Sequence, residues 1–257
     1  MQSIYICPET QKPLSEHEEG LLRGDGILYP FVQGKNNTNI PNFLTTQQQG
    51  EYGKQALAMY DKKDSADIYR NFLNWLYKTF NENDLSFRKK LTSKLNIKKG
   101  DKVLITGCGL GDDVRAVLDA VGPNGEVHAN DLAAKMVVAA SNFNIGEGKV
   151  SLKNLFFSIC DAQVLPFSDD FFDCAFHFGG INLFDDMKAA IWEMDRVVKL
   201  GGRVVFGDEA VAPWLKDTEY GRAAICNNSL WAAEAPLDLL PKTVVDVHLS
   251  WVLGNCF

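Results

Sequence analysis

The stretch KVLITGCGLGDDVRAV, residues 102–117, places three glycines within five positions, between an apolar run and an amphipathic run. The apolar run predicts a buried strand, and the amphipathic run predicts a helix. Glycine at such a turn permits left-handed backbone conformations and lets another group pack closely against the main chain. The stretch therefore predicts the first strand, turn and helix of an α/β fold, with a closely approaching group beside the glycines.

The same alternation of strand and helix continues along the chain. From Lys99 onward, short apolar runs alternate with helical patterns, which predicts a parallel sheet with helices on both faces. The best-defined helix is predicted from Asp185 to Lys199, with Asp185 as its N-cap and Gly201 as its terminator. Its apolar stripe consists of Met187, Ile191, Met194 and Val198.

The residues before this α/β region fall into two zones. Residues 1–50 contain short β-like pieces rich in turn formers, which predict a small β-rich appendage. Residues 51–98 show helical periodicity, broken around Asn81 to Asp84, and predict a pair or trio of helices that serves as a lid or linker. The third zone is the main domain, residues 99–257. An aromatic run such as Tyr69 to Phe80 is more often core than substrate pocket.

Composition limits the classes of protein to consider. The chain has 257 residues and 46% apolar content, enough for one sizeable core. Its formal charge of −7, from 26 basic and 33 acidic side chains, disfavours nucleic acid as a partner. No apolar run approaches the ~20 residues of a membrane helix, and no signal-peptide pattern opens the sequence, so we expect a cytoplasmic protein without membrane contact. The six cysteines include no C-x-x-C pair, and we expect them to be reduced packing residues.

The glycine pattern of the turn is G-x-G-x-G, whereas the dinucleotide fingerprint is G-x-G-x-x-G. Asp112 stands where the third dinucleotide glycine would fall, and together with Asp113 it opens the helix, where two carboxylates oppose a pyrophosphate. Asp131 ends the next predicted strand, where a carboxylate can accept hydrogen bonds from ribose hydroxyls. A ribose site without a pyrophosphate site indicates a nucleoside cofactor.

The segment from Gly100 to Asp208 resembles the class I S-adenosylmethionine-dependent methyltransferases, closest to the ubiquinone and menaquinone biosynthesis type. The resemblance runs in order through GDKVLITGCGLGDD, GEVHANDLAAKMVVAA, CDAQVLPFSDDFFDCAFHFGGINLFDD and AIWEMDRVVKLGGRVVFGDEA. It implies a Rossmann-like, doubly wound, mostly parallel sheet of seven strands in the order 3-2-1-4-5-7-6, with an antiparallel seventh strand expected after Gly254. It also implies S-adenosylmethionine as the cofactor and methyl transfer to an O, N, S or C nucleophile of a small or medium organic acceptor.

The resemblance also implies roles for individual residues. The glycine loop would lie against the methionine part of the cofactor, the acid after the second strand would hold the ribose, and the acid after the third would meet the adenine amino group. The family's usual acid two residues before the first glycine is Ile105 here, so Thr106 or a backbone carbonyl would have to hold the cofactor's amino group. The implied cofactor-binding residues are Thr106, Gly107, Cys108, Gly109, Gly111, Asp131, Leu132, Asp161, Ala162 and His177.

A general base, where the acceptor needs one, is expected at the ends of the fourth and fifth strands. The candidates are His177, Asp208 and Glu209, and His177 is the best single choice because its ordinary pKa is about 6.5. Two structural alternatives stay open: His177 as a core histidine, and the two acids as the start of a loop or a helix cap. The predicted walls of the acceptor pocket are the aromatic helix and the segment after the fifth strand, which offers Trp214, Tyr220 and Trp231.

The appendage has a weaker resemblance of its own. YICPETQKPL and GILYPFVQGKNNTNIPNFL resemble the zinc-ribbon-like module of tRNA methyltransferase activators and of some rRNA methyltransferases. Only Cys7 remains of a C-x-x-C pair, because Thr10 takes the second position, and His17 alone cannot complete a site. We therefore expect no metal, and a degenerate module that packs on the main domain or shapes its entrance.

Two rival functions and the oligomeric state stay open at this point. The appendage suggests an RNA base methyltransferase, against which the acidic charge and the lack of a basic cluster argue. The missing acid at Ile105 permits a non-catalytic module that only binds S-adenosylmethionine.

Overall fold

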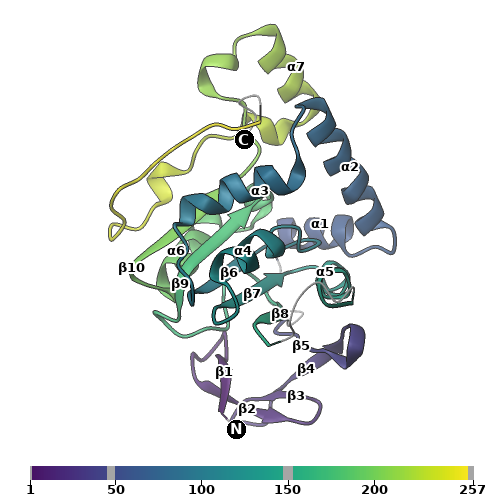
Figure 1. Cartoon of the computed structure of the whole chain (residues 1–257), viewed down its shortest axis with the longest axis vertical. Helices are drawn as coiled ribbons and strands as arrows, with labels where there is room; N and C mark the ends of the chain where they lie inside the picture. Colours follow the sequence, from purple (N-terminus) through teal and green to yellow (C-terminus); the bar gives the residue numbers. More distant parts are fainter. Residues whose placement is uncertain (1, 45–49, 147–152, 254–257) are drawn as a thin grey trace.

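The computed structural model describes residues 2–44, 50–146 and 153–253, and it contains two five-stranded sheets (Figure 1). The sheet of the main domain is parallel, with the order β10-β9-β6-β7-β8. This is the order expected for the first five strands of the doubly wound fold. Its strands are β6 (Lys102–Thr106), β7 (Glu126–Asp131), β8 (Leu155–Ile159), β9 (Phe172–Phe178) and β10 (Val198–Gly207).

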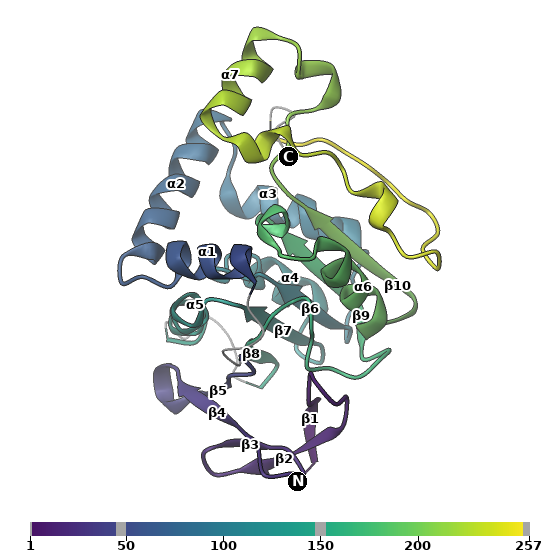
Figure 2. The same cartoon turned by 180° about the vertical axis from the view of Figure 1, so that it is seen from behind.

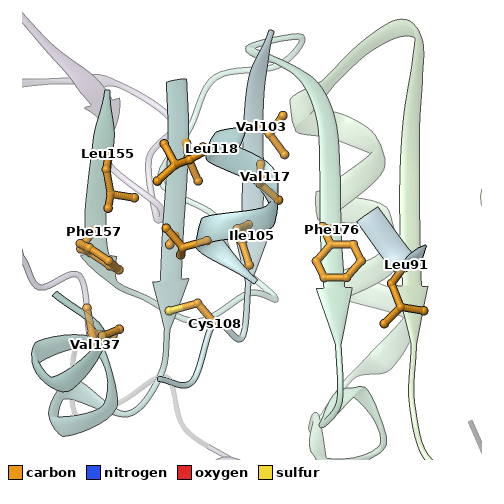
Figure 3. Close-up of a cluster of buried hydrophobic side chains, with 14 of the residues drawn as sticks. Leu91, Val103, Ile105, Cys108, Val117, Leu118, Val137, Leu155, Phe157 and Phe176 are labelled. Carbon is orange, nitrogen blue, oxygen red and sulfur yellow. The ribbon is translucent and has the colours of Figure 1, made fainter. Parts of the chain in front are cut away.

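Helices α3, α4 and α5 cover one face of this sheet, and α6 covers the other. On the first face, Ile105 of β6 lies in one buried cluster with Val117 of α4 and Val137 of α5 (Figure 3). On the second face, Leu104 of β6 lies in a separate cluster with Met194 of α6. Both faces of the strands are therefore apolar, as parallel sheets require. The helices are α3 (Asp84–Thr92), α4 (Val114–Val121), α5 (Ala134–Gly146) and α6 (Met187–Val197).

The N-terminal sheet is antiparallel and packs against the second face of the main sheet. The connection from β8 to β9, residues 160–171, contains no helix, and the ring of Tyr5 lies 5.3 Å from that of Phe167 in this connection. The amide of Phe43 donates to the carbonyl of Ile159 at 2.8 Å. The appendage is thus part of the core. Its strands are β1 (Gln2–Ile6), β2 (Pro13–His17), β3 (Gly20–Leu22), β4 (Leu28–Gln33) and β5 (Asn39–Pro41).

Two further helices, α1 (Glu51–Tyr60) and α2 (Ser65–Thr79), precede α3, and the break between α2 and α3 lies at residues 80–83, as the sequence predicts. Leu73, Leu76 and Tyr77 of α2 are buried in the core, whereas Trp75 is exposed. Figures 1 and 2 show α2 beside α7 (Glu219–Asn227), at the end of the molecule opposite the N-terminal sheet.

The prediction of Asp185 as the N-cap of a helix up to Lys199 is wrong in its boundaries. Helix α6 begins at Met187, and the Asp186 side chain caps it by accepting a hydrogen bond from the Ala189 amide at 2.9 Å. The helix ends at Val197 because the chain passes directly into β10. The Asp185 carboxylate accepts hydrogen bonds from the first turn of α1 instead.

The predicted seven strands are not confirmed, because five form the parallel sheet in the described chain. No strand follows β10 up to residue 253, and the alternating apolar side chains of Val245, Val247 and Leu249 are exposed. The strand predicted after Gly254 lies outside the described residues. No helix in these ranges combines the length and apolarity needed to cross a membrane.

Candidate functional site

A cavity of about 510 Å³ lies where the carboxyl ends of the parallel strands meet α1, α2 and α3. Its size is typical of sites that bind small molecules. We call its strand-end side the floor, formed by lining residues within 107–113, 130–132, 160–163, 177–180 and 208–209. The opposite side, which we call the roof, is formed by lining residues of α1, α2 and α3, among them Met59, Tyr60, Tyr69, Phe72, Tyr77 and Arg88.

The three glycines of the β6–α4 turn all have positive φ angles, but different neighbours require them. A Cβ on Gly107 would lie 2.7 Å from the His177 ring, and a Cβ on Gly111 would lie 2.7 Å from the Asn144 amide. At Gly109 the nearest atom would be in the Tyr69 ring, at an ordinary contact distance of 3.8 Å. Protein side chains therefore approach two of the glycines, and Gly109 leaves the most room for a ligand.

Asp131, at the end of β7, is held by the main chain on both oxygens. Its Oδ2 accepts from the Gly109 amide at 2.8 Å, and its Oδ1 accepts from the Ala133 amide at 2.9 Å. Burial raises the pKa of Asp131 above its ordinary value, against these hydrogen bonds, which lower it. Each carboxylate oxygen retains a second lone pair, so the fixed carboxylate can also accept from two ligand hydroxyls.

Asp161 follows β8 and lies on the same side of the cavity as Asp131. Its oxygens accept from the amide of Gln163 at 2.8 Å and from the Gln163 side-chain nitrogen at 3.0 and 3.1 Å. Burial raises the pKa of Asp161. The apolar side chains of Leu132, Met136 and Ala162 line the cavity as well, so this part of it combines an apolar surface with a hydrogen-bond acceptor.

His177 is fully buried, at 0% exposure, behind Gly107. Its Nδ1 lies 3.0 Å from the Thr106 carbonyl, which can only accept, so Nδ1 carries the proton and Nε2 is an acceptor. Nε2 has no hydrogen-bond partner within the described chain. Burial lowers the pKa of His177, so the imidazole is neutral. The ring is thus a neutral acceptor that borders the cavity from behind Gly107.

Asp208 and Glu209, at the end of β10, have different surroundings. Asp208 accepts from the amides of Gly180, Asn182 and Glu209 at 2.7–3.0 Å, and so fixes the turn after β9. Glu209 accepts through Oε2 from Asn228 at 3.0 Å and from the Trp231 indole at 2.9 Å. Burial raises the pKa of Glu209. Asp208 therefore serves the loop, while Glu209 presents a proton-binding group at the cavity.

The cavity collects most of the residues that the sequence pointed to. Thr106 and Gly111 do not line it, because Thr106 is fully buried against His177 and Gly111 faces Asn144. The predicted pocket walls Trp214, Tyr220 and Trp231 do not line it either. Trp214 and Tyr220 are exposed, and Trp231 is buried and contacts Glu209 from behind. The predicted residues that do line it are Gly107, Cys108, Gly109, Asp131, Leu132, Asp161, Ala162, His177, Asp208 and Glu209.

Sequence reasoning missed a group of charges that joins the floor to the roof. Arg70 of α2 pairs with Asp112 at 2.5 Å, and Arg88 of α3 pairs with Asp113 at 2.8 Å. The helical period of α2 and α3 predicts their apolar sides, but it does not reveal that two arginines meet the aspartates of the glycine turn.

The roof helix α1 is held at both ends by aspartates. Asp185 accepts from the amides of Tyr52 and Gly53 at 2.8 and 3.0 Å, at the N-terminus of α1. Asp61, just after α1, accepts from the Lys135 amide at the start of α5 at 2.8 Å. The roof is therefore fastened to the turn after β9 and to α5. Metal-binding groups of three or more His, Cys, Asp or Glu side chains are absent from the described residues.

Part of this chain is similar in sequence to curated bacterial methyltransferases. Demethylmenaquinone methyltransferase of Geobacillus sp. (strain WCH70) is 33% identical over 149 residues, which cover 57% of this chain and 56% of that protein. The protein of the same name from Staphylococcus aureus (strain JH9) is 34% identical over 154 residues, which cover 56% and 61%. The alignments thus span somewhat more than half the length of these curated relatives.

One solved structure supports the fold. It is a Methanococcus maripaludis protein described as an S-adenosyl-L-methionine-dependent methyltransferase, with a TM-score of 0.50 and 16% identity over 73% of this chain and 78% of that one. Residues 78–212, which include α3, the glycine turn and all five parallel strands, match the model of the ubiE/COQ5 methyltransferase family. This chain therefore belongs to the ubiE/COQ5 methyltransferase family.

Proposed function

We propose that this chain transfers the methyl group of S-adenosylmethionine to a small aromatic acceptor. The observation that carries the proposal is the pair of carboxylates at the ends of neighbouring strands β7 and β8, Asp131 and Asp161, on the floor of one cavity. Family membership supports it, because the matched residues 78–212 contain both acids.

The floor fits an adenosine group. Asp131 is held by two main-chain amides and can accept from both ribose hydroxyls. Asp161 can accept from the adenine amino group, and Leu132, Met136 and Ala162 offer apolar contacts to the ring. The Gln163 side chain donates hydrogen bonds to both oxygens of Asp161. When adenine binds, Gln163 would either keep one of these bonds or move away.

The cofactor, when bound, supplies a methyl group already activated as a sulfonium. The chain's part is therefore to orient an acceptor and to exclude water. The roof helices close the cavity from above, and Asp185 and Asp61 hold α1 in that position. These few contacts therefore keep the cavity closed. Because the methyl group is already activated, the acceptor needs at most one base.

Glu209 is the best-placed of the three candidate bases. His177 is buried behind Gly107, and Asp208 is engaged by three amides. Glu209 lines the cavity, and both of its donors reach one oxygen, Oε2, which leaves Oε1 for an acceptor. Burial raises the pKa of the Glu209 carboxyl toward neutral pH, and a carboxylate with a higher pKa is a stronger base. We assign His177 to positioning, through its contact with the glycine turn.

The lining of the roof favours a planar aromatic acceptor. Tyr60, Tyr69 and Phe72 from the helices and Phe178 and Phe184 from the floor side face the cavity. The similar bacterial proteins are named for demethylmenaquinone, a quinone. Glu209 would take the hydroxyl proton of a hydroquinone while the ring carbon takes up the methyl group. The hydrogen already on that ring carbon would then leave as a proton, which restores the aromatic ring, and the bonding electrons of the donor's carbon–sulfur bond would stay with the demethylated cofactor.

The experiment is a methyl-transfer assay with S-adenosylmethionine and a reduced naphthoquinone that carries a short prenyl chain. We expect methylated product and S-adenosylhomocysteine in equal amounts by mass spectrometry. Glu209→Gln should lower kcat by about 10²-fold with cofactor affinity retained, and His177→Ala should lower it less. Cofactor binding without turnover of any aromatic acceptor would contradict the proposal and favour a module that only binds.

A further inference from the structure

Five charged side chains form a cluster at the junction of the cavity's floor and roof. Arg88 pairs with Asp84 at 2.5 Å and with Asp113 at 2.8 Å, and it lies 3.7 Å from Asp112. Arg70 pairs with the other oxygen of Asp112 at 2.5 Å. Arg88, Asp112 and Asp113 line the cavity. Three members of the cluster therefore belong to the site, whereas the side chains of Asp84 and Arg70 also reach solvent.

The cluster is one positive charge short. Three carboxylates face two guanidinium groups, and Asp113 is only 6% exposed. Oδ2 of Asp113 pairs with Arg88, whereas Oδ1 is buried and has no hydrogen-bond partner among the residues described. Burial raises the pKa of Asp113, although Arg88 opposes this. A buried carboxylate oxygen without a donor is costly, and a cationic ligand group would satisfy it.

The end of β6 presents no acidic side chain to a cationic group. Ile105, which replaces the expected acid, is 1% exposed and lies in the apolar cluster under α4 and α5 (Figure 3). The Thr106 hydroxyl and carbonyl both contact Nδ1 of His177, at 3.2 and 3.0 Å. The Thr106 side chain, one of the substitutes that the sequence suggested, therefore already contacts His177, and the Thr106 carbonyl shares that partner.

We propose that Oδ1 of Asp113 binds the α-amino group of S-adenosylmethionine, in place of the acid that is missing at Ile105. The inference rests on the proposed function, because it assumes that the floor holds this cofactor. Asp113 is the acid for this role because Asp112 is paired through both oxygens and Asp84 does not line the cavity. The ammonium group supplies the missing positive charge, and Arg88 keeps the carboxylate in place.

The test compares two ligands that differ only in the amino group: S-adenosylhomocysteine and its deaminated analogue. The native protein should bind S-adenosylhomocysteine more tightly by about tenfold to about a hundredfold, as for a hydrogen bond between charged groups. Asp113→Asn should lose this preference, with affinity for the deaminated analogue unchanged. Asp84→Asn is the matched control, because it removes a partner of Arg88 outside the cavity, and it should keep the preference.

Methylthioadenosine, which lacks the whole amino-acid part, reports on the adenosine floor. Its binding by Asp113→Asn at native affinity would show that the variant is folded and that its defect is confined to the amino group. Equal losses for all three ligands, or an unchanged preference, would overturn the assignment of Asp113. Failure of the native protein to bind any of them would overturn the proposed function, and this inference with it.

Discussion

The floor and the roof of the cavity are built by different means. The floor carboxylates Asp131, Asp161 and Asp208 each accept a hydrogen bond from a main-chain amide one or two residues further along the chain. Asp131 and Asp208 also accept from an amide in the turn that follows the neighbouring strand. The roof is held by side chains distant in sequence, such as Arg70 on Asp112 and Asp185 on the start of α1. The floor therefore forms with the sheet, whereas the roof depends on a few long-range polar contacts.

The largest expected effect is on the junction between the two. Arg88→Met removes the guanidinium between Asp84 and Asp113 and leaves the buried Asp113 carboxylate unpaired, which should cost about 3 to 5 kcal/mol of unfolding free energy. The neighbouring Lys89 pairs with Asp119 at 3.3 Å on the surface, so Lys89→Met should cost no more than about 1 kcal/mol. Urea denaturation of both variants measures the difference, and equal losses would refute a buried junction.

The next effect isolates the floor. Asp131→Ala should weaken S-adenosylhomocysteine binding by about 1 to 3 kcal/mol, because the ribose loses a fixed carboxylate. The exposed Asp169 lies outside the cavity, and Asp169→Ala should leave calorimetric affinity unchanged. Native affinity in folded Asp131→Ala would remove the ribose assignment.

Neighbouring aspartates permit a matched test of the roof. Asp185 holds the N-terminus of α1, and Asp186 caps α6, so each change to alanine should cost about 1 kcal/mol of stability. Only Asp185→Ala should also weaken ligand binding, because Asp185 and α1 line the cavity whereas Asp186 and α6 do not. Parallel thermal and calorimetric measurements decide this, and identical binding by both variants would show that the α1 contact is merely structural.

The smallest expected effect is on how the free energy of unfolding depends on pH. Burial raises the pKa of Glu209 above 4.5, so the folded protein holds this proton more tightly than the unfolded chain does. Stability should therefore fall as pH rises from the ordinary carboxyl value through the raised one. Glu209→Gln should flatten this decline, measured by denaturation from about pH 4 to about pH 7. Glu234→Gln, at an exposed carboxylate, is the control and should leave the decline unchanged. The same dependence of stability on pH in both variants would contradict the burial of Glu209.

The same contrast explains what the sequence could predict. Strand ends follow from local patterns, and Gly109, Asp131, Asp161 and Glu209, which were selected from those patterns, line one cavity at the carboxyl edge of the sheet. Contacts between side chains from different elements do not follow from periodicity. Arg88 therefore escaped notice, and Trp214, Tyr220 and Trp231 were expected at a cavity that they do not line. The aromatic helix does line it, through Tyr69 and Phe72.

The sequence also could not decide which of two similar residues close together in the chain takes a given role. Asp185 and Asp186 both suit a helix N-cap, and only the packing of α1 decides that the first serves another helix. Gly107 and Gly111 were both expected to contact the cofactor, but Gly111 does not line the cavity. The His177 ring requires a glycine at 107, and the Asn144 amide requires one at 111. Tertiary packing, which a single sequence does not display, made these choices.

The most direct test of the central claim is a crystal structure with S-adenosylhomocysteine bound. The account predicts ribose hydroxyls within hydrogen-bond distance of Asp131, adenine beside Asp161 and Ala162, and the amino-acid part directed toward Asp113. Density for the ligand outside this cavity, or an empty cavity at saturating S-adenosylhomocysteine, would contradict it.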